Sequence, residues 1–361
     1  MMTDTRKRTA ADGCTMGVDN HAVGKAGVDS HEIDQSDNDG RKRRRRPFRR
    51  GGRLMISALL RPAAILFLLA GSALAVALRA APVREGVIYV APDPSSTKLA
   101  NLARGRELVV LGTSGNWVQV EATLSEQRTV TGWIEDKGIV RSNTANGDEI
   151  LFGEAVDSED QASRANGRNG AAQDAMRLYS RAAEYFPNSP LAGEALYRSA
   201  DIRWQIEKAD VMSRPSAKEQ DAYLREGMDE KYMREVMKKF PGTKWADLAA
   251  FALLDNKLCG DWQAASKCPD KEAELYEKYV NEHPQSVKVA EALYDAAYRR
   301  SALIEIYKNE DQSKKSQESK VKATALAEKV VTQFSTTDWA ARAERLLFSL
   351  AEDMPTYGNA P

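Results

Sequence analysis

The sequence predicts a multidomain protein in which an N-terminal membrane segment precedes a small all-β barrel and then an all-α helical-repeat solenoid. Three observations predict it. An uncharged apolar run follows a basic block, short β-branched and aromatic runs occupy residues 83–141, and one helical pattern recurs four times within residues 149–352. A chain of 361 residues has room for two such domains and tails.

Residues 1–53 have the composition of a disordered, basic cytoplasmic tail. They hold 13 Lys/Arg against 8 Asp/Glu and include the basic run Arg41–Arg50. A basic run alone indicates binding to anionic lipid or nucleic acid. Its position directly before an apolar run favours a topology signal instead, because positive charge is retained on the cytoplasmic side of a membrane. We therefore expect no nucleic-acid partner.

Residues 54–79 are expected to be either a transmembrane helix or a signal segment. The uncharged run Pro62–Leu78 has 17 residues. At about 1.5 Å per residue it reaches roughly 25 Å, close to the ~30 Å hydrocarbon core of a bilayer. We favour an uncleaved single-pass anchor in a bacterial inner membrane, with the bulk of the chain in the periplasm.

Cleavage is the alternative for this segment. Small residues at Ala73–Ala77 and Arg79–Ala81 suit a signal peptidase, so the chain would be secreted to the periplasm after cleavage near residues 75–81. Met55 is an alternative to Met1 as the true start.

Residues 83–141 are interpreted as strands of a small barrel, divided by Gly, Pro, Asn and Asp. The strand candidates are Val87–Val90, Glu107–Leu111, Trp117–Val120 and Val130–Ile134. The pair Gly115-Asn116-Trp117 and Gly132-Trp133-Ile134 resembles bacterial SH3-type domains, a family that often binds cell-wall peptidoglycan or peptides. The chain departs from that family at Ile88-Tyr89-Val90, where Asn-Val-Arg is usual.

Tyr89, Trp117 and Trp133 are the candidate ligand-binding residues of the barrel. Flat amphipathic rings stack on sugars and prolines and offer one polar tip. The alternative is that Trp117 and Trp133 are partly buried core residues.

After a linker at residues 142–148, each of four repeat copies has an apolar helix that ends near Pro187, Pro241, Pro284 or Ser335. Proline ends a helix because it lacks the N–H donor and disfavours helix in the preceding residue. Hydroxyl residues two places further on are expected to cap the second helix. They are Ser189, Thr243, Ser286 and Thr337. Alanines eight residues beyond the anchors let helices approach closely: Ala195, Ala249, Ala292 and Ala343.

The expected helices are 149–164, 171–186, 190–208, 218–240, 244–258, 271–282, 287–308, 316–334 and 338–352, with a tail at 353–361. Two charged junctions, Asp210–Gln220 and Lys308–Lys320, are expected to be solvated inserts. Aromatic residues at helical spacing favour core packing over a binding stripe. They are Tyr179, Tyr197, Trp204, Tyr276 and Tyr294.

The pattern of Tyr179–Leu196 resembles tetratricopeptide-type repeats of bacterial envelope proteins, and the resemblance covers roughly residues 149–352. Two such families are the lipoprotein subunit of the outer-membrane β-barrel assembly machine and the periplasmic coordinator of the Tol-Pal system. The resemblance implies partner proteins in the envelope. One departure is that no Cys follows the membrane segment within residues 70–85, where the lipoprotein family carries its lipid.

The cysteines agree with an oxidising compartment. Cys14 lies in the expected tail, and the other two, Cys259 and Cys268, are nine residues apart. An isolated pair outside the cytoplasm is most simply a disulfide, and two free thiols are the alternative.

An enzyme is the competing class, because SH3-type domains accompany cell-wall hydrolases. His283 is the one histidine beyond the membrane segment, so a zinc centre or a nucleophile–histidine pair would depend on it. It occupies the position that is Phe in the other copies. Ser319–Lys322 has Ser-x-x-Lys spacing without the accompanying motifs. We expect no catalytic residue, no metal site and no cofactor.

The sequence therefore favours a non-enzymatic cell-envelope scaffold or adaptor. The barrel would bind cell wall or a peptide, and the repeats would bind an envelope protein. The alternative is a component of outer-membrane protein assembly or of Tol-Pal-like envelope coordination, and a cell-wall hydrolase is less favoured.

Overall fold

The computed structural model describes residues 78–125 and 127–357, all within one compact unit of the chain. Within these ranges no helix has both the length and the apolar character needed to cross a bilayer. The basic tail and the membrane segment expected from the sequence lie outside the described residues, except for Leu78 and Arg79.

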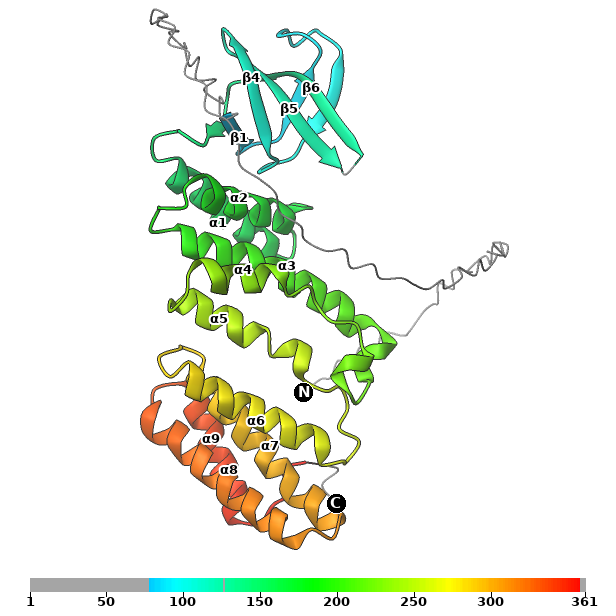
Figure 1. Cartoon of the computed structure of the whole chain (residues 1–361), viewed down its shortest axis with the longest axis vertical. Helices are drawn as coiled ribbons and strands as arrows, with labels where there is room; N and C mark the ends of the chain where they lie inside the picture. The colour runs from blue at the N-terminus through cyan, green and yellow to red at the C-terminus, as the bar shows by residue number, and fades with distance from the viewer. Residues whose placement is uncertain (1–77, 126, 358–361) are drawn as a thin grey trace, which may run out of the picture. The chain divides into compact units, whose positions relative to one another are not determined.

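A curled antiparallel sheet of seven strands comes first (Figure 1). Its strands are β1 Leu78–Pro82, β2 Gly86–Tyr89, β3 Lys98–Leu102, β4 Leu108–Ser114, β5 Trp117–Ser125, β6 Arg128–Glu135 and β7 Ile139–Arg141. The order across the sheet is β3-β2-β6-β5-β4-β1-β7. The chain therefore returns β7 to the side of β1, which brings the two ends of the strand domain together.

Buried and more exposed residues alternate along the strands, and the buried ones form the core of the sheet. On β5, Val118, Val120 and Ala122 are fully buried, while the residues between them face away. Successive side chains on a strand point to opposite faces, so one face packs inward. Ile88 of β2 and Ile134 of β6 join the same core cluster.

The sheet begins earlier than residue 83, the expected start of the barrel. β1 includes Leu78 and Arg79, the last two residues of the expected membrane segment. Ala80 and Ala81 are fully buried. The sequence pattern missed this strand because its residues, LRAAP, include no β-branched or aromatic side chain. A cleavage after Ala81 would remove four of the five residues of β1, whereas a cleavage after Ala75 or Ala77 leaves the strand whole.

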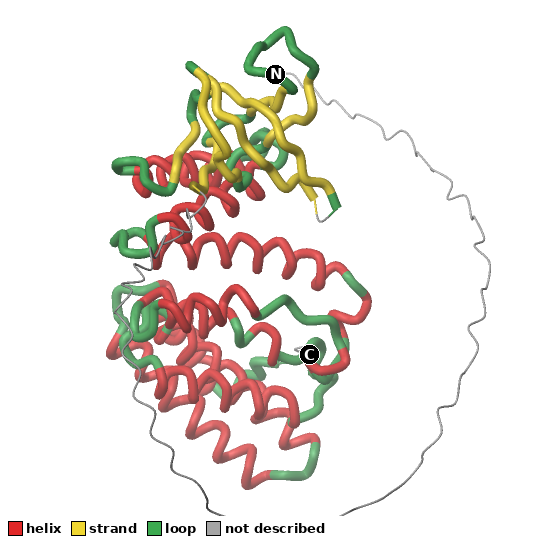
Figure 2. Tube along the Cα trace, turned by 45° about the horizontal axis from the view of Figure 1, so that its top comes forward, coloured by secondary structure: helices red, strands yellow, loops and turns green. Residues whose placement is uncertain are grey.

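Nine α-helices follow among the described residues, shown in red in Figure 2. They are α1 Gly147–Ser163, α2 Ala171–Tyr185, α3 Ala192–Ser213, α4 Lys231–Lys239, α5 Lys244–Ala252, α6 Lys267–Glu282, α7 Val289–Asn309, α8 Ser313–Gln333 and α9 Asp338–Ala351. The first helix of every copy ends in the same backbone conformation, with φ between −126° and −130°. The residues at these ends are Phe186, Phe240, His283 and Phe334.

The second helices carry the expected alanines, all four of which are fully buried. Thr243 and Thr337 cap their helices by accepting a hydrogen bond from the backbone N–H of the third residue beyond. Ser189 and Ser286 were wrongly expected to do the same. Their hydroxyls accept from the amide two residues on, at 3.1 Å, in a turn that precedes the helix.

The expected helix 218–240 is wrong in its first half. Residues 214–230 form two short 3₁₀ turns, Pro215–Lys218 and Ala222–Leu224, joined by extended backbone. The side chain of Asn256 holds both the N–H and the carbonyl of Met228. These long-range contacts replace the helical hydrogen bonds that the local sequence would support.

Other boundaries also differ from expectation. α3 runs to Ser213, into the expected insert Asp210–Gln220, and α6 begins at Lys267 rather than 271. α5 ends at Ala252 rather than 258, and a 3₁₀ turn, Asp255–Lys257, follows it. The expected insert Lys308–Lys320 is mostly helix, because α8 already begins at Ser313. Lys and Glu are good helix formers, so a charged stretch need not be a loop.

The expected linker 142–148 is short and ordered, and its last two residues start α1. The strand domain packs directly on the helices: Ala81, Val83 and Val140 share one hydrophobic cluster with Leu151 and Leu178. In addition, the buried Tyr185 hydroxyl of α2 donates to the carbonyl of Ala80 at 2.8 Å.

Candidate functional site

The three candidate aromatic residues lie on the outer face of β2, β6 and β5, which are neighbours in the sheet. Tyr89 is the cross-strand partner of Trp133. Trp117 and Trp133 are half-buried, and each directly precedes a residue of the core cluster, Val118 or Ile134. Neither tryptophan belongs to that cluster of buried residues.

Two of the three rings are in contact. The ring centroids of Tyr89 and Trp117 are 5.7 Å apart with an interplanar angle of 89°, an edge-to-face arrangement. Trp133 lies beside Tyr89 in the register but is not in ring contact with it. Next to Trp117, the Asp136 N–H donates a hydrogen bond of 2.8 Å to the Asn116 carbonyl, which joins the end of β6 to the turn before β5.

Two surface clefts adjoin these rings. One, of about 300 Å³, is lined by Tyr89, and the other, of about 490 Å³, by Trp117. Glu135 and Lys137, both exposed, line both clefts. The arrangement offers flat rings for stacking together with one carboxylate and one ammonium group. The sequence analysis did not single out either charge, although Glu135 stands two residues after Trp133 and so shares its face of the strand.

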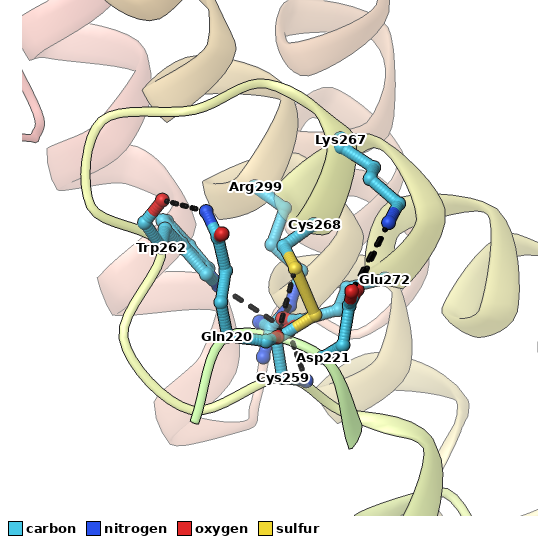
Figure 3. The surroundings of a disulfide bond; sticks show 8 residues. All are labelled: Gln220, Asp221, Cys259, Trp262, Lys267, Cys268, Glu272 and Arg299. Carbon is cyan, nitrogen blue, oxygen red and sulfur yellow. Dashed lines mark hydrogen bonds and ion pairs between the residues drawn. A yellow bond between two sulfur atoms is a disulfide. The ribbon is translucent and has the colours of Figure 1, made fainter. Parts of the chain in front are cut away.

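Cys259 and Cys268 are joined in a disulfide, with their Cα atoms 6.1 Å apart (Figure 3). Glu272, 2% exposed, lies beside it. One carboxylate oxygen of Glu272 accepts from Cys259 N–H at 2.8 Å and from Trp262 Nε1–H at 3.2 Å. The other accepts from Arg299 Nε–H at 2.7 Å. One buried carboxylate thus ties the disulfide loop to α6 and α7.

The disulfide loop also contacts segments distant in sequence. Gly260 N–H donates to the Glu219 carbonyl at 2.9 Å, and the Gln220 side chain donates to the Trp262 carbonyl at 3.0 Å. On its other side, the Trp262 ring packs against Tyr357 of the C-terminal tail. Every polar group in these contacts has a partner from the chain, so the disulfide region is a structural junction.

His283 makes contacts that hold the helices of the repeats together. Its Nδ1 lies 2.8 Å from an Asp247 carboxylate oxygen, and its ring stacks on Tyr279 at 4.8 Å. Ser319 is buried in α8. Within residues 78–125 and 127–357, no three side chains of the metal-binding types come together as a possible metal site.

Aromatic contacts join successive repeats. Tyr197 stacks on Trp245 at 5.6 Å, and Tyr294 packs on Trp339 at 5.4 Å. In both pairs, the residue ten places after one anchor meets the residue four places after the next. Phe251 follows the same rule, but Lys288 replaces the tryptophan and lies 5.2 Å from the ring centroid. These rings hold repeats together, and Tyr179, Trp204 and Tyr276 are buried.

No protein-family model matches this chain, and no curated protein shows significant similarity to it.

Proposed function

We propose that the chain is a non-enzymatic cell-envelope scaffold. Its SH3-type barrel binds cell wall or a peptide, and its tetratricopeptide-like repeats bind a partner protein. The observation that carries the proposal is the outer aromatic face: Tyr89, Trp117 and Trp133 are not members of the buried core cluster, and Tyr89 and Trp117 each line a surface cleft. Half-exposed rings that are not needed for packing are suited to stacking on a ligand.

The packing between the barrel and the first helices supports a scaffold. Ala81 and Val83 share a hydrophobic cluster with Leu151 and Leu178, so a ligand on the barrel and a partner on the repeats would be held by one body. The disulfide supports an oxidising compartment, because structural disulfides persist outside the cytoplasm. Anchoring in an inner membrane through residues 54–77, or release into the periplasm, is part of the same proposal.

The barrel half of the proposal is tested by sedimentation of the purified full chain with isolated cell walls. We expect the unaltered protein to sediment with the walls and Trp117→Ala and Tyr89→Ala to remain in solution. Tyr223→Ala is the matched control, because Tyr223 is an aromatic residue 79% exposed on the helical domain. Equal sedimentation of all variants would exclude the aromatic face as the ligand site.

The repeat half is tested by crosslinking in envelopes of the native host followed by affinity purification. We expect a specific envelope protein crosslinked to the helical domain. If the full chain sediments with no cell wall and crosslinks to no envelope protein, the scaffold proposal fails as a whole.

A further inference from the structure

A groove of about 140 Å³ lies between α2, α3 and α4, helices labelled in Figure 1. Its lining includes three guanidinium groups and two carboxylates, together with an aromatic ring. They are Arg177, Arg181, Arg203, Glu184, Glu235 and Tyr232. α2 and α4 are the first helices of two successive repeats, and α3 is the second helix of the earlier one. All three line the groove.

Most of these charges already have partners. Arg177 pairs with Asp174, Arg181 pairs with Glu184, and Glu235 is 2.7 Å from Lys239. Arg203 differs, because no carboxylate of the described residues lies within ion-pair distance of it. Its guanidinium carbon lies 4.0 Å from the centroid of the Tyr232 ring. That ring supports the cation but does not neutralise it.

A second copy of the repeat shows what an arginine at this position binds. Arg300 is sixteen residues after Pro284, as Arg203 is sixteen after Pro187. Arg300 is buried and pairs with two carboxylates of α6, Asp270 and Glu277, the latter at 2.8 Å.

The first repeat lacks both of those carboxylates. The positions on α2 that correspond to Asp270 and Glu277 are occupied by Gln173 and Ser180. Ser180 lines the groove. The arginine is therefore present in the first repeat without the acceptors that the third repeat supplies, and its partly exposed guanidinium is open to an acceptor from outside the chain.

A further arginine adds positive charge nearby. Arg106, in the loop before β4, lies two residues after Arg104, whose carbonyl accepts from Arg177 Nε–H at 2.9 Å. Burial, and then the charges of Arg177 and Arg181, lower the pKa of Arg106. No carboxylate within the described ranges is at ion-pair distance from Arg106 either. Arg106 thus adds a positive charge near Arg177 and Arg181 that no carboxylate of the described residues pairs with.

We propose that this groove binds an acidic side chain of a partner polypeptide, with Arg203 as the direct contact and Arg106 adding electrostatic attraction. The inference rests on the proposed partner-binding function of the repeats and names the chemistry of the partner. A polypeptide fits better than a free inorganic anion, because Met176, Leu196 and Tyr232 give the groove apolar surface as well.

The test measures binding of fluorescent peptides to the full chain purified in detergent. The probe is a peptide of alternating Glu and Gly, and the reference is the same peptide with Gln in place of Glu. We expect the unaltered protein to bind the acidic peptide in preference to the neutral one. Binding should weaken as salt rises, because salt screens exposed charges.

Two variants address the arginine in opposite ways. Arg203→Gln removes the cation and should weaken binding of the acidic peptide about fivefold, the usual limit for one exposed ion pair. The double variant Gln173→Asp, Ser180→Glu keeps Arg203 but restores the acceptors of the third repeat. It should weaken binding at least as much. Arg342→Gln is the matched control, since Arg342 also lies over an aromatic ring, 4.8 Å from the centroid of Trp339.

Equal or absent binding of the acidic and neutral peptides overturns the inference, as does unchanged binding by folded Arg203→Gln. Should Arg203→Gln misfold, the double variant decides, because it retains the arginine and its contact with Tyr232. Crosslinking to an envelope protein without preference for the acidic peptide removes this inference alone. Failure of both experiments removes the partner-binding function of the repeats as well.

Discussion

At the scale of single residues, desolvation of a charged group costs stability even where a partner is present. Asp295 on α7, which pairs with Arg299, is the clearest case. Burial raises its pKa to about 6, and the nearby charge of Arg299 opposes part of that increase. Arg299 Nη1–H donates to the Asp295 carboxylate at 3.3 Å.

Asp295→Asn is expected to change how stability depends on pH. Because the pKa of Asp295 is higher in the folded than in the unfolded chain, the folded state binds more protons between about pH 4 and pH 6. The unfolding free energy of the unaltered protein therefore falls as pH rises through that window. The variant should be more stable by roughly 1 kcal/mol at pH 7.5 and gain nothing at pH 4. Urea unfolding at both pH values measures this, and an equal difference at both would contradict it.

Glu272→Ala is expected to lower the free energy of unfolding more than most single substitutions. It removes the acceptor of three N–H groups, those of Cys259, Trp262 and Arg299. Removing one partner of a buried ion pair costs about 3 kcal/mol, since the other charge stays buried. Glu274→Ala, an exposed site on the same helix, is the control and should lie within about 0.5 kcal/mol of the unaltered protein. A loss below 1 kcal/mol for Glu272→Ala in denaturant titration would show that this carboxylate is not the link.

At the scale of elements, the sequence predicts those strands and helices whose formation depends mainly on nearby residues. Strands with β-branched and aromatic residues and helices that end at aromatic-Pro were found from sequence, with small errors at their ends. β1 was missed because Ala80 and Ala81 carry no strand signal and are buried only through contacts with β4, β7 and the Tyr185 hydroxyl. The sequence of residues 218–230 predicts a helix because the hydrogen bond between Asn256 and Met228 joins residues far apart in the sequence and leaves no local signal.

Some features of the candidate site can likewise be predicted from the sequence, and others depend on the folded structure. Tyr89, Trp117 and Trp133 could be chosen by residue type, and strand alternation places them on one face. Their contact across β6, and the clefts that share Glu135 and Lys137, depend on how the sheet curls. Arg203 could be singled out only by aligning repeats against the contacts of Arg300. Sequence spacing alone does not show which arginine lacks a carboxylate.

The disulfide is the element-scale feature with the most direct chemical test. Replacing Cys259 and Cys268 by Ser should lower the unfolding free energy by about 2–3 kcal/mol, the loop-closure value for a loop of this length. Alkylation of the denatured, unreduced full chain should label one thiol, that of Cys14, and reduction should expose two more. Three labelled thiols before reduction would rule the bridge out.

At the scale of the whole molecule, the junction of the strand domain with α2 decides whether the chain acts as one body. Gly105 is in the left-handed region, at φ 68°, and its backbone lies against α2. A Cβ added there would be 2.7 Å from Arg177 Cβ and 2.8 Å from Leu178 N. Neither neighbour is the end of a flexible side chain, so the two domains would have to separate locally.

Gly105→Ala should therefore uncouple the domains. We expect a single calorimetric transition for the unaltered protein and two for the variant, because the shared hydrophobic cluster would no longer close. Gly115→Ala is the matched control: its φ is 56°, but nothing lies within 4 Å of the added Cβ. It carries the same backbone strain without the clash and should keep one transition. Two transitions in the unaltered protein would contradict a single body.

Photo-crosslinking in living cells of the native host tests the scaffold most directly. A photoreactive residue replaces Lys137, which is exposed and lines both barrel clefts, or Ser180 in the repeat groove, with Tyr223 as the control position. We expect a cell-wall fragment or peptide attached at position 137 and an envelope protein at position 180, with neither at 223. Identical products at all three positions, or none at 137 and 180, would contradict a scaffold that uses these two surfaces.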